Sequence, residues 1–149
     1  MKASLIIIGN EILSGRTQDK NLSYLATWLN EIGIQLSEVR VIRDEEDEII
    51  DTVNLLRRKY NYVFTTGGIG PTHDDITSES IAKAFNVDLE INPQALAILK
   101  EYYKDSDLTE ARMKMTQIPK GAILVENPVS KAPGFKIENV FVMAGIPTI

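Results

Sequence analysis

The chain has no cysteine and a single histidine, His73. The lack of cysteine excludes disulfides, thiolate catalysis and cysteine-ligated zinc, and it fits a cytoplasmic protein. No serine–histidine–aspartate arrangement can be argued from the sequence either. A lone histidine in a loop is usually solvated, and the alternative for His73 is a contact with a metal or a phosphate.

Long apolar runs are also lacking. The run at residues 5–8 is too short for a signal peptide or a membrane span, so we expect no membrane partner. The net charge of −5 argues against a nucleic-acid backbone as the main partner. With 149 residues, 44% of them hydrophobic and 25% charged, the composition predicts one globular domain over residues 1–149.

A glycine-rich stretch at residues 65–75 is the most informative feature. A short apolar strand is predicted before it, at residues 60–64, and a helix after it, at residues 76–85. The glycines allow backbone N–H groups to converge on an anion, and the start of the helix favours negative charge. Two aspartates, Asp74 and Asp75, would repel a phosphate unless they hold a metal or accept hydrogen bonds. The stretch therefore predicts a phosphate-bearing ligand, with Mg²⁺ or another divalent metal beside it.

Strands and helices alternate along the chain, without repeats or linkers. This order predicts an α/β fold, a three-layer α/β/α sandwich with a mostly parallel sheet and a C-terminal hairpin. The helix expected at 45–59 is acidic at its start and basic at its end, which complements the helix dipole. The other expected helices are 19–32; 93–104, with Asn92 as its N-cap; and 107–116, with Asp107 and Glu110 at the spacing of a capping box. The expected strands are 3–8, 34–42, 87–91, 122–125 and the hairpin 135–137 with 140–143, joined by a two-residue turn at 138–139.

Four motifs occur in an order that resembles a known family. They lie at residues 66–77, at 9–16 with Asp19 and Asn21, at 127–135 and at 145–147. This pattern resembles the molybdopterin-binding MoaB/Mog-like domains, and it is closest to the N-terminal domain of the competence-damage-inducible (CinA) family. The resembling families continue with a helix after the motif at 145–147, so we expect a chain truncated at its C-terminal helix. Apolar sheet surface would then be exposed unless a partner subunit covers it, which predicts a homo-oligomer, a dimer or a trimer.

Candidate site residues come from these motifs. By the motif match, Asp75 corresponds to an aspartate that the Mog-like families place in the ligand site, and Asp44 falls where they carry another. We assign both a catalytic role, with helix N-caps as the alternative, and we assign Asp74 and Asp75 to the metal. Asp74 departs from the basic residue that Mog proper has there. The predicted substrate-binding residues are Ser14, Gly15, Asp19, Thr66, Gly67, Gly68, Gly70, Thr72, Gly145 and Pro147.

Two functions of different class follow from the resemblance. The first is a domain that binds molybdopterin, a phosphorylated pterin, or a nucleotide, with or without nucleotidyl transfer. The second is a metal-dependent pyrophosphatase that hydrolyses ADP-ribose or a related dinucleotide, in which a carboxylate-bound metal would activate water. A third reading, an interaction module that keeps only the fold, stays open because fold does not fix function.

Overall fold

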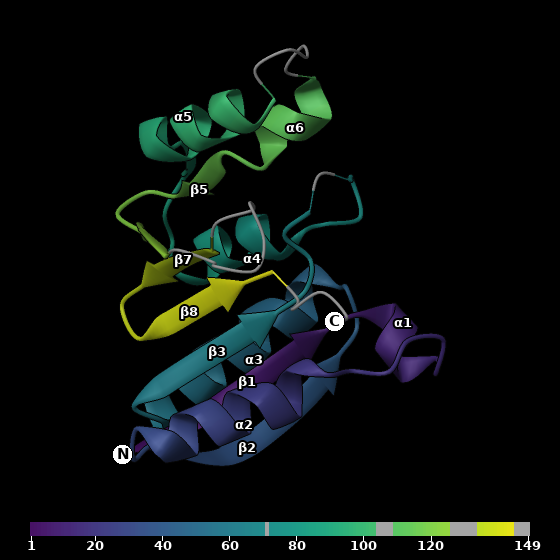
Figure 1. The fold of residues 1–149 in the computed structure, drawn as a ribbon, viewed down its shortest axis with the longest axis vertical. Helices are drawn as coiled ribbons and strands as arrows, with labels where there is room; N and C mark the ends of the chain where they lie inside the picture. The colour runs from purple at the N-terminus through teal and green to yellow at the C-terminus, as the bar shows by residue number, and fades with distance from the viewer. Residues whose placement is uncertain (71, 104–108, 126–133, 145–149) are drawn as a thin grey trace.

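The computed structural model describes residues 1–70, 72–103, 109–125 and 134–144. A six-stranded sheet runs in the order β2-β1-β3-β8-β7-β6 (Figure 1). Its first four strands are parallel, and β7 and β6 continue it antiparallel. The strand bounds are β1 Lys2–Ile8, β2 Gln35–Ile42, β3 Tyr62–Thr66, β6 Ile123–Val125, β7 Gly134–Ile137 and β8 Val140–Met143.

Helices cover both faces of this sheet. Helix α2 (Asn21–Glu31) packs on one face, and α3 (Glu46–Lys59) and α4 (Thr77–Ala84) pack on the other (Figure 1). Alternate residues of β1 serve the two cores: Leu5 and Ile7 face α2, whereas Ile6 and Ile8 face α3 and α4. Because both faces are covered, β1 is buried from Ala3 to Ile8 and is apolar there except for Ser4. The predicted α/β fold, with a mostly parallel sheet and a C-terminal hairpin, is confirmed.

A smaller unit stands beside the main sheet. Strands β4 (Leu89–Ile91) and β5 (Gln117–Pro119) pair antiparallel, and α5 (Pro93–Tyr102) and α6 (Glu110–Lys114) lie with them (Figure 1). We name β4, α5, α6 and β5 the small lobe. The sequence did not predict β5, because three residues that end in proline carry no strand signal.

Several local predictions need correction. The loop after β1 contains a short helix, α1 (Asn10–Leu13). Thr109 caps α6 by accepting from the Arg112 N–H at 3.1 Å, and the expected capping residue Asp107 lies outside the described residues. By contrast, Asn92 caps α5 as predicted, accepting from the Ala95 N–H at 2.9 Å. No helix in the described part of the chain is long and apolar enough to cross a membrane.

Candidate functional site

The candidate site lies where the parallel strands end. Strand β1 ends at Ile8, β2 at Ile42 and β3 at Thr66, and all three point toward the same edge of the sheet (Figure 1). In open α/β sheets, ligands bind outside the carboxyl ends of the strands. The hydroxyl of Thr66 is buried there without a hydrogen-bond partner among the described residues. This edge is therefore where the predicted loops meet.

Two glycines shape the loop between β3 and α4. Gly67 and Gly68 have φ angles of 96° and 73°, the left-handed region that favours glycine. A Cβ atom on Gly67 would lie 2.1 Å from the Ile8 carbonyl oxygen, and one on Gly68 would lie 2.1 Å from the Thr77 hydroxyl. The glycines are thus required by the close approach of the loop to β1 and α4, in addition to any space that a ligand needs.

Thr77, the first residue of α4, fixes the direction of the loop. Its fully buried hydroxyl donates to the Gly67 carbonyl at 3.0 Å, and its N–H donates to the Gly68 carbonyl at 3.0 Å. With these carbonyls turned toward Thr77, the N–H groups of Gly68, Ile69 and Gly70 donate to no carbonyl among the described residues. Sequence reasoning did not identify Thr77, although a threonine at the start of a helix after a glycine turn is a usable signal.

Asp75 is held inside the same loop. Its carboxylate accepts from the Thr72 N–H at 2.9 Å and from the Thr72 hydroxyl at 2.7 Å. A Cβ atom on Gly70 would lie 2.8 Å from this carboxylate. The structure therefore brings Gly70, Thr72 and Asp75 together as predicted. The Thr72 hydroxyl, however, is engaged by Asp75 rather than pointing freely at a ligand.

Asp44 joins the loops after β1 and β2. Its carboxylate accepts from the Asn10 N–H at 3.2 Å, and its own N–H donates to the Asn10 side-chain oxygen at 3.2 Å. Helix α3 begins after Glu45 without a side-chain cap, so the alternative of Asp44 as its N-cap is wrong. Burial raises the pKa of Asp44, the Asn10 hydrogen bond lowers it, and the charges of Glu11, Asp75 and Asp74 raise it further. Asp44 therefore interacts electrostatically with acidic side chains of both loops.

Ser14, Gly15 and Asp19 are the remaining predicted site residues that the structure describes. Ser14 and Gly15 are exposed at the end of α1, where the Ser14 hydroxyl donates to the Glu11 carbonyl at 3.3 Å and accepts from Arg16 at 3.3 Å. Asp19 accepts from the Leu22 N–H at 2.9 Å and so stabilises the start of α2. Its substrate-binding role stays a prediction. Gly145 and Pro147 lie outside the described residues.

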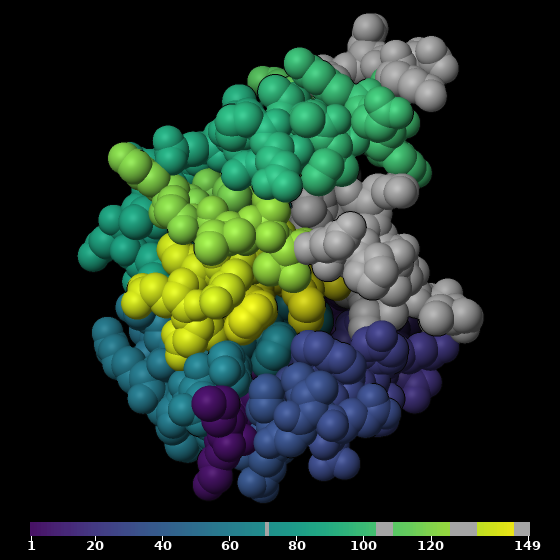
Figure 2. Space-filling view, turned by 60° about the vertical axis from the view of Figure 1, so that its left-hand side comes forward, coloured from purple at the N-terminus to yellow at the C-terminus, as the bar shows by residue number. Residues whose placement is uncertain are grey.

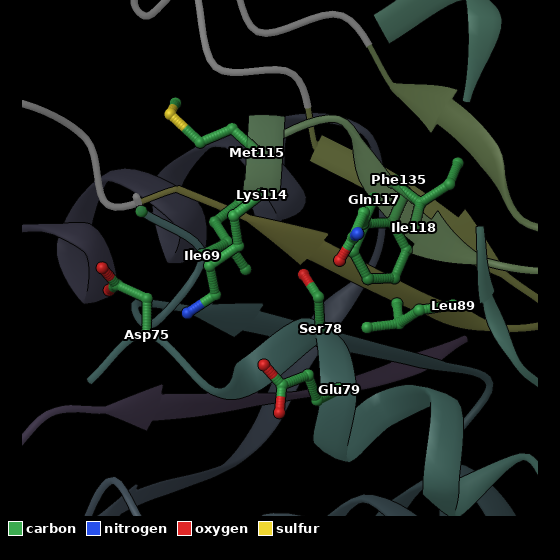
Figure 3. Close-up of a pocket in the computed structure, with 11 residues that line it drawn as sticks. Ile69, Asp75, Ser78, Glu79, Leu89, Lys114, Met115, Gln117, Ile118 and Phe135 are labelled. Carbon is green, nitrogen blue, oxygen red and sulfur yellow. The ribbon is translucent and has the colours of Figure 1, made fainter. Parts of the chain in front are cut away.

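A pocket opens between the β3–α4 loop and the small lobe. Figure 3 shows the Lys114 side chain extending toward the side of the pocket where Asp75 lies. The Lys114 amine donates to the Thr72 carbonyl, and it is the only cation among the described residues that line the pocket. The sequence analysis assigned Gly70 and Asp75 to the site and did not assign the other residues that line this pocket. Its lining is Ile69, Gly70, Asp75, Ser78, Glu79, Leu89, Lys114, Met115, Gln117, Ile118 and Phe135.

Acidic side chains near the loop do not form an evident metal centre. His73 and Asp74 pair with each other at 3.3 Å, and both are almost fully exposed, at 95% and 84%. In the parts of the chain that the structure describes, no group of three or more histidine, cysteine, aspartate or glutamate residues is arranged to hold a metal ion. The assignment of Asp74 and Asp75 as metal ligands therefore stays a prediction.

Comparison with known sequences places the chain in a family. It matches the family described as "Probable molybdopterin binding domain" over residues 4–149. A protein of Sulfurisphaera tokodaii is 41% identical over 152 residues, which cover 97% of this chain and 58% of that protein. A protein of Pyrococcus abyssi is 36% identical over 161 residues, which cover 99% of this chain and 64% of that protein. The chain thus spans about three fifths of the length of these relatives.

Solved structures agree with this result. The CinA protein of Thermoplasma acidophilum, whose function is described as unknown, has a TM-score of 0.89 at 39% identity, covering 98% of this chain and 89% of that one. The tungsten cofactor synthesizing protein MoaB of Pyrococcus furiosus has a TM-score of 0.58 at 19% identity, covering 97% and 81%, and shows a shared fold. The resemblance inferred from the four motifs is confirmed. The chain belongs to the family of probable molybdopterin binding domains.

Proposed function

We propose that this domain binds a phosphorylated pterin or nucleotide, with the phosphate against the β3–α4 loop. The observation that carries the proposal is the run of N–H groups at Gly68, Ile69 and Gly70, which donate to no carbonyl among the described residues. Successive free N–H groups in a turn form an anion-binding concavity, and the N-terminus of α4 adds partial positive charge. A phosphate would supply the acceptors that these groups lack.

The pocket beside the loop has the character expected for the ring of such a ligand. Ile69, Leu89, Ile118 and Phe135 give it an apolar lining, and polar side chains stand around them (Figure 3). Apolar walls with a few placed polar groups are typical of small-molecule sites. The Asp75 and Glu79 carboxylates can accept hydrogen bonds from ring N–H and amino groups. Lys114 offers a positive charge to a phosphate.

The comparisons support a pterin over the pyrophosphatase alternative. The family description names molybdopterin, and the MoaB title names a tungsten cofactor. Neither description names hydrolysis of a dinucleotide. Molybdopterin fits the donors of this site, because its phosphate needs N–H donors and its pterin ring needs carboxylate acceptors.

The test is calorimetric titration of the protein with a pterin phosphate, with ADP-ribose and with inorganic phosphate. Asp75→Asn keeps an acceptor for Thr72 but removes the charge that ring N–H groups would meet. We expect this variant to weaken pterin phosphate binding by about 1–3 kcal/mol, roughly 5- to 150-fold, the cost of an impaired charged hydrogen bond. Inorganic phosphate should bind the variant as well as it binds the wild type, or better.

Asp74→Asn is the matched control, because the neighbouring aspartate is exposed and pairs with His73. Equal losses in the two variants would indicate a general effect of charge and contradict the contact with Asp75. Failure of the folded protein to bind any of the three probes would overturn the proposal. Turnover of ADP-ribose with a divalent metal would instead support the pyrophosphatase function.

A further inference from the structure

The segment 72–75 is a turn that is closed by its own hydrogen bonds. The Thr72 carbonyl accepts from the Asp75 N–H at 3.1 Å, and the Thr72 N–H and hydroxyl both donate to Oδ2 of Asp75, at 2.9 and 2.7 Å. His73 and Asp74 lie between them, with exposed side chains. Because these bonds join only Thr72 and Asp75, they fix the shape of the turn but do not fix its position against the rest of the molecule.

Lys114 supplies a contact that holds this turn from outside. It is the last residue of α6 in the small lobe, and its amine donates to the Thr72 carbonyl. Among the described residues, no other element donates a hydrogen bond to the turn. A positive charge beside a turn that carries the carboxylates of Asp74 and Asp75 is also electrostatically favourable.

The bond from Lys114 joins two separate parts of the structure. Figure 2 shows the small lobe, in green, at one end of the molecule, with the N-terminal elements, in purple and indigo, at the other. The turn belongs to the loop that follows β3 of the main sheet, and the pocket lies between that loop and the small lobe. The small lobe can therefore act on the turn through Lys114.

The turn also determines which oxygen of Asp75 is left for a ligand. Both donors of Thr72 bond to Oδ2, and Oδ1 accepts no hydrogen bond from the described residues. Asp75 lines the pocket, so Oδ1 is an acceptor that a bound molecule can use. Hydrogen bonds weaken steeply as the donor departs from a linear geometry. A shift of the turn would consequently misplace this acceptor.

We propose that Lys114 is a positioning residue for recognition of the ligand's ring. By holding the Thr72 carbonyl, it sets the place of the turn and hence the direction of Asp75 Oδ1. The small lobe then contributes to recognition through a side chain that need not touch the ring. This inference rests on the proposed function, in which Asp75 accepts hydrogen bonds from ring N–H groups. It differs from the attraction of Lys114 for a phosphate, because it also operates on a pterin without one.

The first measurement is amide hydrogen exchange of Thr72 and Asp75 in the free protein, by NMR. Lys114→Met keeps most of the side-chain length and removes the charge and the donors. We expect both amides to exchange about tenfold faster or more in this variant, because a hydrogen bond from a charged donor is lost. Lys100→Met is the matched control, since Lys100 is exposed on α5 of the same lobe, and it should leave the exchange unchanged.

The second measurement is calorimetric titration with neopterin, a pterin that carries no phosphate. Lys114→Met should weaken its binding by about 3- to 10-fold, and it should have no further effect once Asp75→Asn is present, because residues that act through one another are not additive. Lys114→Arg keeps a charged donor and should recover part of both the affinity and the slow exchange. Lys100→Met should bind neopterin as well as the wild type does.

Three results would overturn the positioning role. They are unchanged exchange at Thr72 in Lys114→Met, a loss of affinity confined to a phosphorylated pterin, and an equal loss with and without Asp75→Asn. The last would show that Lys114 acts independently of Asp75. A wild type that binds no pterin would overturn the proposed function and with it the contact to the ring. The exchange rates would then still decide whether Lys114 holds the turn.

Discussion

Two loops meet at the carboxyl edge of the sheet, and they are held by different means. The β3–α4 loop is held through its backbone: two left-handed glycines lie against Ile8 and Thr77, and Thr77 bonds two successive carbonyls. The β1–α1 loop is held through side chains, by the reciprocal hydrogen bonds between Asn10 and Asp44. The hydrogen bonds that hold Gly67 and Gly68 to Thr77 include no titratable group, whereas the Asn10–Asp44 pair includes a carboxyl group with a raised pKa.

We expect the two loops to have different roles, one in anion binding and the other in the response to pH. A backbone loop with fixed carbonyls keeps its N–H groups aimed in one direction, which is the preorganisation that anion binding requires. A loop tied by a partly buried carboxyl can respond to the protons and charges around it. We therefore expect changes in the β3–α4 loop to alter the stability of the fold strongly. Changes at Asp44 should have smaller and pH-dependent effects.

The largest effect is expected from Gly67→Ala. The new Cβ atom would meet the Ile8 carbonyl oxygen, and alanine is strained at a φ of 96°. Together these should lower the free energy of unfolding by about 2–4 kcal/mol, measured by urea titration. Gly33→Ala is the control, since Gly33 has a φ of 81° but no atom near its Cβ position, and should cost about 1–2 kcal/mol. Equal costs would show that the loop can move away from β1.

A smaller effect is expected from Thr77→Val, which keeps the shape of the side chain and removes its hydroxyl. The Gly67 carbonyl then loses its donor, and we expect the free energy of unfolding to fall by about 1–3 kcal/mol. Thr77→Ser keeps the hydroxyl and should lose less. If the serine variant is as unstable as the valine variant, packing of the Thr77 methyl group, and not the hydrogen bond, holds the loop.

Features set by neighbouring residues were predictable from the sequence. The acidic start and basic end of α3 marked its bounds to within one residue, and the Asn92 cap marked the start of α5. The β7–β8 hairpin and its turn at 138–139 were also predicted, and Glu138 takes the positive φ that a two-residue turn requires. In each case a local pattern determines the local structure.

Features that depend on distant residues were not predictable. An aspartate just before a helix, as Asp44 is, predicts an N-cap. Its actual partner, Asn10, is 34 residues away, so tertiary packing decides that Asp44 bonds to Asn10 instead of capping α3. Lys114 lies 42 residues from Thr72, on a different lobe, so no local spacing could place it in the pocket. Strand β5 pairs with β4 across both α5 and α6, and its three residues form a strand only because that partner exists.

The smallest effect is expected at Asp44, and it depends on pH. Because burial and nearby negative charges raise its folded pKa above the ordinary value of 3.8, the folded protein holds this proton more readily than the unfolded chain does. Its contribution to stability is therefore present at low pH and is lost as pH rises through the raised value. Asp44→Asn removes the charge and keeps an acceptor for Asn10. Relative to the wild type, this variant should gain stability as pH rises, by less than about 1 kcal/mol because the group is partly exposed.

Denaturant titrations at a series of pH values measure this difference in the free energy of unfolding between Asp44→Asn and the wild type. Glu11→Gln in both backgrounds should shrink it, since Glu11 is one of the charges that raise this pKa. A difference that stays constant with pH would show that Asp44 behaves as a solvated carboxylate, and that the two loops do not differ in their response to protons.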